Sequence, residues 1–85
     1  MNEYSFKFEK AAIKFLKRQN PSTQQRIMDA IHKLPHEGDI KPMQGWPGYY
    51  RLRVGKYRVI YTVDNGRLVV VVVGAGSRGD VYKGS

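Results

Sequence analysis

The residues best suited to chemistry are three arginines in the second half of the chain, Arg51, Arg53 and Arg58. The dipeptide Gly55-Lys56 is typical of a two-residue hairpin turn, which pairs Arg53 with Arg58 and puts Arg51 on the same face. Like charges directly opposite destabilise a strand pair, so folding alone gives no reason for this pattern. Guanidinium groups bind phosphate oxygens and suit a phosphate backbone or the charge that develops on a phosphorane. The alternative is that all three are solvated residues of a half-exposed sheet.

Four further residues could assist these arginines. Arg78 follows a glycine-rich stretch, where the backbone can approach a ligand closely, and Tyr82 could stack on a nucleobase. Lys56, at the hairpin tip, and Lys83 would add positive charge for binding RNA. Arg78 could equally be a surface arginine, and Tyr82 an anchor that packs on the sheet.

The two histidines and the only tryptophan are expected to have structural roles. His32 lies on a predicted helix and His36 in the loop after it, and the chain has no cysteine, so the set of metal ligands is weak. Trp46, between Gly45 and Pro47, is expected to cover the edge of the core. No phosphate-binding or dinucleotide-binding glycine motif is present in the sequence, and we expect no metal and no cofactor.

The elements that must position these residues begin with a strand and two helices. Aromatic residues alternate with polar ones over residues 4–8, which indicates a short strand. The spacing then becomes that of an amphipathic helix that ends before Asn20, and Ser22 with Gln25 forms the capping pattern of a second helix. Residues 35–48, rich in proline and glycine, are expected to form a connecting loop.

Three more strands are predicted, at residues 49–54, 57–63 and 67–73. Asn65-Gly66 is a strong signal for a two-residue turn and pairs Val63 with Leu68. The order β-α-α-β-β-β, with the strand and helical pair packed on one face of a small antiparallel sheet, is an α+β fold. The opposite face is part cationic and part apolar, because it combines the arginines with Ile60, Thr62, Val69, Val71 and Val73.

Length and charge fit one small basic domain over residues 1–85, with a net charge of +8. Residues 1–40 have seven basic and five acidic residues, a net +2, whereas residues 41–85 have eight and two, a net +6. Such a surface attracts nucleic acid, an acidic protein or an anionic membrane. The absence of cysteine, of a long apolar run and of a signal-peptide pattern favours a cytoplasmic protein that does not enter a membrane.

Two stretches, residues 43–61 and 76–82, resemble the RelE/ParE superfamily of bacterial and archaeal toxins. The likeness extends over nearly the whole chain, because the leading strand and the two helices match in order and length. It implies a RelE-like toxin that cuts messenger RNA in the decoding site of the ribosome and is neutralised by an acidic antitoxin in a hetero-oligomer. The implied reaction is metal-independent attack of the 2′-hydroxyl on the adjacent phosphate, which gives a 2′,3′-cyclic phosphate and a free 5′-hydroxyl.

The resemblance also implies a role for each residue of the site. Arg51 and Arg53 match a basic pair that helps to activate the 2′-hydroxyl and holds phosphate, and Arg58 matches the arginine that stabilises the transition state. Tyr82 matches a tyrosine that stacks on or orients the nucleotide, and Arg78 a loop arginine. The basic pair is lysine in the best-known RelE. Because a guanidinium group is a poor base, Arg51 and Arg53 are expected to position and neutralise the phosphate, and the role of general acid would fall to Tyr82 or Arg78.

Two other functions stay open at this point. A ParE-like toxin would bind and poison DNA gyrase without cutting RNA. A non-catalytic module would use the basic, valine-rich face of the sheet mainly to dock an antitoxin. The joint presence of the five residues matched to the site favours the nuclease.

Overall fold

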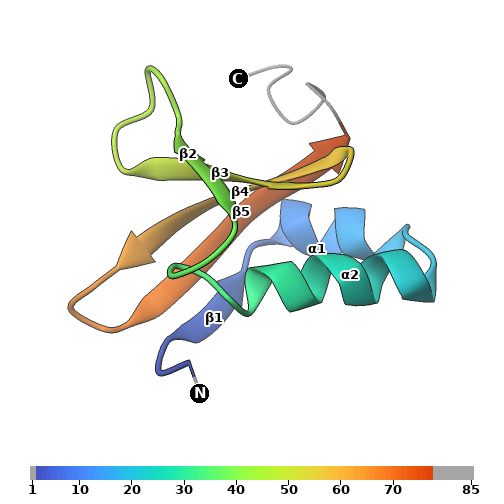
Figure 1. Ribbon diagram of the computed structural model, residues 1–85, viewed down its shortest axis with the longest axis horizontal. Coiled ribbons are helices and arrows are strands. Elements are labelled where there is room, and N and C mark those ends of the chain that lie inside the picture. The colour runs from blue at the N-terminus through green and yellow to red at the C-terminus, as the bar shows by residue number, and fades with distance from the viewer. Residues whose placement is uncertain (1, 78–85) are drawn as a thin grey trace.

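Two helices cover one face of a five-stranded sheet (Figure 1). The structure is a computed structural model and describes residues 2–77. Within that range the sheet order is β1-β5-β4-β3-β2. The elements are β1 (Ser5–Phe8), α1 (Lys10–Lys17), α2 (Pro21–Ile31), β2 (Asp39–Pro42), β3 (Tyr49–Val54), β4 (Tyr57–Asp64) and β5 (Val69–Ser77). The predicted α+β class is confirmed, with two differences. The first strand, β1, is an edge strand of the sheet and does not pack on its face, and it runs parallel to β5, so the sheet is mixed.

The second helix begins earlier than its sequence pattern predicted. Its N-cap is Asn20, whose side-chain oxygen accepts a hydrogen bond of 2.8 Å from the backbone N–H of Thr23. Pro21 occupies the first turn, where a missing N–H costs no hydrogen bond. The predicted cap at Ser22 is therefore wrong, and Ser22 instead donates its hydroxyl to the Asn20 side chain.

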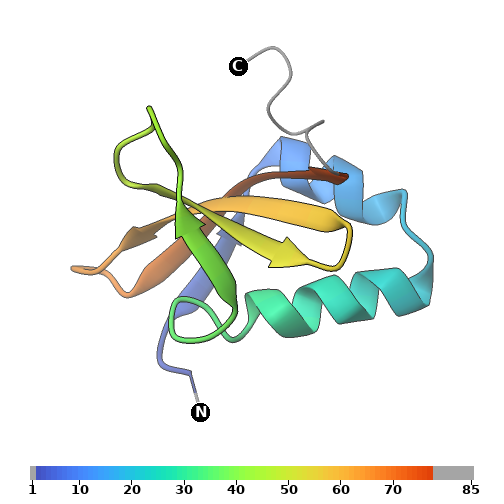
Figure 2. The same cartoon turned by 45° about the horizontal axis from the view of Figure 1, so that its top comes forward.

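The segment predicted as a loop contains a short edge strand, β2. It pairs antiparallel with β3, and Ile40 lies opposite Leu52. Figure 2 shows β2 at the edge of the sheet, with the loop after it extending away from α2. Because the strand has four residues, only one of them half-buried, and ends at Pro42, the alternation that identifies a strand is too short to read.

The β3–β4 hairpin has the register that its turn predicted. Arg53 pairs with Arg58, and Leu52 with Val59. Gly55 has a φ of +60°, and a Cβ there would lie 2.8 Å from a guanidinium nitrogen of Arg26 on α2. The positive φ favours glycine at this turn, and the absence of a side chain also leaves space for the Arg26 guanidinium.

The β4–β5 hairpin differs from the prediction. Val63 pairs with Val70 rather than Leu68, so the connection is a four-residue loop instead of a two-residue turn at Asn65-Gly66. Leu68 has a φ of +55° at the end of this loop. A β-bulge follows beside Ile60 and Tyr61, and beyond it Ala75 lies opposite Val59, where the predicted turn would place Val72.

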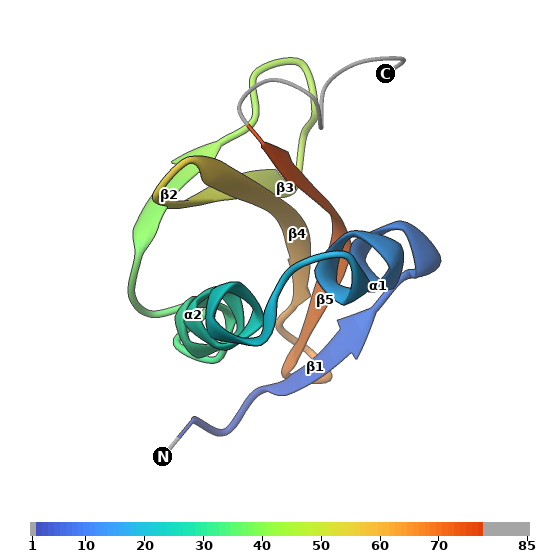
Figure 3. The ribbon, with the colours of Figure 1, turned by 90° about the vertical axis from the view of Figure 1, so that its right-hand side faces the viewer.

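The core lies between the helices and the sheet, which curves around α2 (Figure 3). It is formed by Ala12, Ile27, Ile31, Leu34, Leu52, Val54, Val59, Tyr61, Val70 and Val72. Tyr61 is 2% exposed and stacks on Tyr50 with ring centroids 5.6 Å apart. Burial, with a smaller effect of Tyr50, raises the pKa of Tyr61 to about 12. Neither described helix is long and apolar enough to cross a membrane.

The raised pKa of Tyr61 predicts a stability loss at high pH. The folded protein holds this proton more tightly than the unfolded chain, whose tyrosine pKa is about 10, so the free energy of unfolding falls as the pH rises from about 10 to about 12. In Tyr61→Phe this decrease in the free energy of unfolding should be smaller by roughly 2 kcal/mol, as measured by urea denaturation at successive pH values. Tyr49→Phe, on the opposite face, is the control, and an unchanged pH profile in Tyr61→Phe contradicts the prediction.

The core on the helix side predicts a second difference in stability. Ile27 is fully buried, so Ile27→Ala should lower the free energy of unfolding by roughly 2–5 kcal/mol. Ile13→Ala is the matched control, because the same atoms are removed from a side chain that is 39% exposed, and its cost should stay below about 1 kcal/mol. Equal costs in urea denaturation would show that the core is not centred on α2.

Candidate functional site

The candidate site is the face of the sheet away from the helices, where β3 and β4 present Arg51, Arg53 and Arg58. We call this surface the arginine face. Arg53 lies directly opposite Arg58, and Arg51 lies opposite Ile60. Since paired residues share a face and faces alternate along each strand, all three arginines project from the same side. The predicted grouping of the arginines is confirmed by this register.

Two of the three arginines have an unused hydrogen-bond donor. Arg51 and Arg58 are half-buried, and the Nε of each is buried without a hydrogen-bond partner among residues 2–77. Arg53 is exposed, and its Nε donates to the carbonyl of Gly55 at 3.4 Å. A buried donor without a partner costs roughly 1–3 kcal/mol, so a ligand that accepts from Arg51 and Arg58 would recover stability on binding. Such a ligand needs anionic oxygens.

The charge of the arginine face is not neutralised by nearby carboxylates. Asp39 lies opposite Arg53 in the β2–β3 register, yet these two form no salt bridge. In the part of the chain that the structure describes, the single ion pair joins Arg67 to Asp64, in the β4–β5 loop. The positive potential of the site is therefore available for a ligand, and an anion would be attracted most strongly at low salt.

Glycines replace side chains on the strand next to Arg58. The four-residue loop and the β-bulge together place Gly76 opposite Arg58 and Gly74 opposite Ile60, where the predicted register had valines. Ile60 is 5% exposed and gives this face a buried apolar floor. Sequence reasoning missed both glycines as neighbours of the site, because the five valines before them fit several registers equally well. Glycine within a strand commonly marks a close approach of a ligand or another backbone.

The remaining predicted charges are not brought into this cluster. The ammonium group of Lys56 lies 5.6 Å from the ring centroid of Tyr57, whose ring contacts Phe15 edge-on near α1. Lys56 therefore leans toward the helix side of the sheet. Arg78, Tyr82 and Lys83 lie outside the described residues, and their roles stay predictions.

The histidines pack against aromatic residues, as expected for structural roles. His32 meets Phe6 edge-on with centroids 5.1 Å apart, and His36 meets Tyr4 in the same way at 5.6 Å. Within residues 2–77 no group of three or more acidic or histidine side chains could hold a metal ion. The expectation for Trp46 is wrong: its side chain is 42% exposed and lines a hollow beside Arg51.

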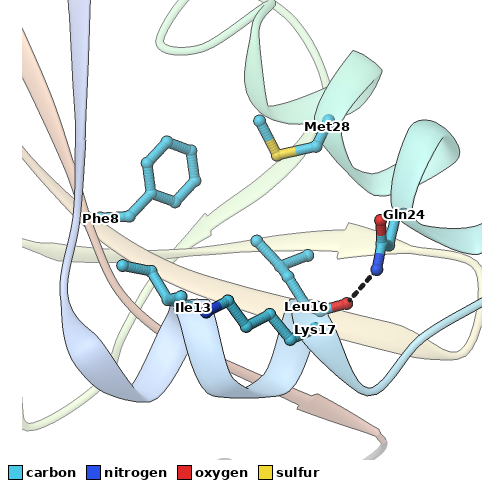
Figure 4. Close-up of a pocket in the computed structure, with 6 residues that line it drawn as sticks. All are labelled: Phe8, Ile13, Leu16, Lys17, Gln24 and Met28. Atoms are coloured by element: carbon cyan, nitrogen blue, oxygen red, sulfur yellow. Dashed lines mark hydrogen bonds between the residues drawn. The ribbon is translucent and has the colours of Figure 1, made fainter. Parts of the chain in front are cut away.

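A second hollow, on the helix side, has a different character. It measures about 280 Å³, and Figure 4 shows its lining of Phe8, Ile13, Leu16, Lys17, Gln24 and Met28. The Gln24 amide is engaged with the Leu16 carbonyl at 2.9 Å. This apolar groove offers one amine and no acid–base pair, so the chemistry of the molecule is concentrated on the arginine face.

Comparison with known proteins agrees with this fold. A family model described as "ParE toxin of type II toxin-antitoxin system, parDE" matches residues 6–82. The RelE–RelB complex of Pyrococcus horikoshii OT3 is similar, with 27% identity, a TM-score of 0.73, and coverage of 94% of this chain and 99% of that one. The RelB–RelE complex of Methanococcus jannaschii has 28% identity, a TM-score of 0.72, and coverage of 89% and 94%.

A bacterial complex extends the likeness beyond the archaea. The RelBE2 toxin–antitoxin complex of Mycobacterium tuberculosis has 25% identity, a TM-score of 0.78, and coverage of 94% of this chain and 97% of that one. A search of curated protein sequences gives no match. Since the family model covers most of the chain, the protein belongs to the ParE toxin family of type II toxin–antitoxin systems, within the RelE/ParE superfamily.

Proposed function

We propose that this toxin is a cytoplasmic, ribosome-dependent endoribonuclease that cleaves messenger RNA in the decoding site and so inhibits translation. The observation that carries the proposal is the pair of unpartnered donors at Arg51 and Arg58 on a cationic face whose arginines form no salt bridge within residues 2–77. RNA supplies a phosphodiester, whose anionic oxygens can accept hydrogen bonds from these donors. RelE-containing complexes at 25–28% identity support the same branch of the superfamily.

The proposed reaction forms and breaks one bond each at a single phosphorus atom. The 2′-oxygen bonds to phosphorus as the bond to the 5′-oxygen breaks, which leaves a 2′,3′-cyclic phosphate and a 5′-hydroxyl. Arg58 stabilises the negative charge that grows on the phosphoryl oxygens, and Arg51 and Arg53 hold the substrate phosphates. Guanidinium groups are poor bases, so Arg51, Arg53 and Arg58 act through their charge. The proton of the 2′-hydroxyl passes to solvent water, and Tyr82 or Arg78, outside the described residues, is assigned to protonate the leaving oxygen.

The proposed partner of the free toxin is an acidic antitoxin. The three solved complexes pair RelE-like chains with RelB-type antitoxins, and the net charge of +8 here would attract an acidic chain. A toxin–antitoxin hetero-oligomer would neutralise this positive charge until the antitoxin is lost.

The gyrase-poisoning alternative is favoured by the family description, which names ParE. It needs no RNA chemistry from the arginines.

The assignment of Arg58 predicts a large loss of RNA cleavage in Arg58→Ala. Removing one donor that stabilises a transition state costs about 10²- to 10³-fold in rate, so cleavage should fall by at least that factor while the protein stays folded. The measurement is primer extension on a translated message with added ribosomes. Arg67→Ala removes the same charge from an exposed loop position and should cleave at the wild-type rate.

The same assay separates the proposed function from its alternatives. Full activity of Arg58→Ala would refute the role of Arg58. An uncut message with the wild-type toxin, together with DNA breaks trapped by purified gyrase, would replace the nuclease by a gyrase poison. An uncut message without gyrase breaks would leave antitoxin binding as the function.

The different surroundings of Arg51 and Arg53 predict unequal effects on cleavage. Arg51→Gln removes a guanidinium with a buried, unpartnered Nε, whereas Arg53→Gln removes an exposed one that already contacts the chain. A hydrogen bond to a charged group contributes roughly 1.5–3 kcal/mol, so Arg51→Gln should lose about 10- to 100-fold in cleavage rate. Arg53→Gln should lose about tenfold or less. The reverse order in single-turnover assays contradicts the predicted division of roles.

A further inference from the structure

The hollow beside Arg51, at the β2 edge of the sheet, adjoins the arginine face and is large enough for a small ligand. It measures about 290 Å³, close to the lower end of small-molecule sites at ~300 Å³. It is lined by Lys41, Pro42, Met43, Gln44, Trp46 and Arg51. Arg51 belongs to both the hollow and the arginine face, so the two surfaces are continuous.

The aromatic wall of this hollow is fixed by the backbone. Met43 donates its N–H to the carbonyl of Tyr49 at 2.9 Å, which closes the loop between β2 and β3. Within that loop Trp46 donates to Met43 at 3.2 Å and accepts from Tyr49 at 3.1 Å. The indole also meets the Tyr49 ring edge-on, with centroids 6.1 Å apart. Although 42% of Trp46 is exposed, its position is therefore well determined, as a stacking surface requires.

The cationic wall is formed by one side chain from each of two strands, Lys41 from β2 and Arg51 from β3. Lys41 lies directly opposite Arg51 in the β2–β3 register, so both side chains project from the same face. Like charges at such positions destabilise the strand pair, and the Nε of Arg51 has no partner among the described residues. An anion between these side chains would relieve both costs. An aromatic wall next to a pair of cations matches the two halves of a nucleotide, a base and a phosphate.

We propose that this hollow binds one nucleotide of single-stranded RNA, beside the nucleotide whose phosphate the arginine face holds. The base stacks on Trp46, and the phosphate is bound between Lys41 and Arg51. The choice of RNA rests on the proposed function. Trp46 would then help to position the message. Its contact with a base is separate from the bond-breaking step assigned to Arg58.

The single tryptophan of the chain makes this contact directly measurable. The probe is a trinucleotide with 2′-O-methyl groups, which cannot be cleaved because it has no free 2′-hydroxyl. It should quench the Trp46 emission in a saturable way at low salt. A matched backbone of the same charge without bases should bind but leave the emission nearly unchanged, because only a stacked base meets the indole.

Substitutions test the two walls separately, by fluorescence anisotropy of the labelled trinucleotide. Stacking contributes roughly 1–3 kcal/mol per base, so Trp46→Ala should weaken binding about 5- to 100-fold, and Trp46→Phe should stay within about threefold. Lys41→Ala should weaken binding and reduce the salt slope by about one. Leu68→Ala, at another exposed apolar residue in the β4–β5 loop, should bind as the wild type does.

Any of four outcomes would overturn the inference. The first is that trinucleotide at up to ~1 mM, above the ~0.1 mM dissociation constant of the weakest non-specific binding, does not quench the Trp46 emission. The second is equal quenching by the backbone without bases, and the third is unchanged affinity in Trp46→Ala. Quenching by an acidic peptide but not by RNA would also overturn it. The assay needs neither ribosomes nor cleavage. Quenching by RNA of a toxin that fails to cut messages would therefore support the subsite while the proposed function fails. A toxin that cuts messages but is not quenched by RNA would support the proposed function and refute the subsite.

Discussion

The register of the β3–β4 hairpin is the constraint on which the rest of the structure depends. A slip of one residue would exchange the two faces of both strands, so Arg51, Arg53 and Arg58 would enter the core and Leu52 and Val59 would face water. The turn prevents this slip, because Gly55 takes a positive φ and leaves space for the Arg26 side chain. The site and the core are thus fixed by the same few hydrogen bonds.

Much of this arrangement could be predicted, because the signals are local. The two-residue turn and the alternation on either side of it gave the pairing of Arg53 with Arg58. The register of β5 could not be predicted, since the five consecutive valines from Val69 to Val73 are apolar on both faces and carry no alternation. Asn65-Gly66 then suggested a tight turn where the chain forms a four-residue loop.

The parts of the candidate site that sequence reasoning missed depend on contacts distant along the chain. Gly76 lies beside Arg58 only because the four-residue loop and the bulge together shift β5, and β2 is a strand only because β3 pairs with it. The sequence predicts that Trp46 covers the edge of the core, yet the loop between β2 and β3 leaves it exposed beside Arg51. The placement of these residues follows from pairing between strands, which no short pattern records.

The parallel pairing of β1 with β5 has a consequence for the time at which the toxin becomes active. β5 lies between β1 and β4 in the sheet, although it is the last of the described elements to leave the ribosome. Until it emerges, β1 has no strand partner, and the strand that supplies Gly74 and Gly76 beside the arginines is missing. The arginine face is therefore incomplete for as long as β5 is missing, and the native sheet closes only after all the other described strands have been made.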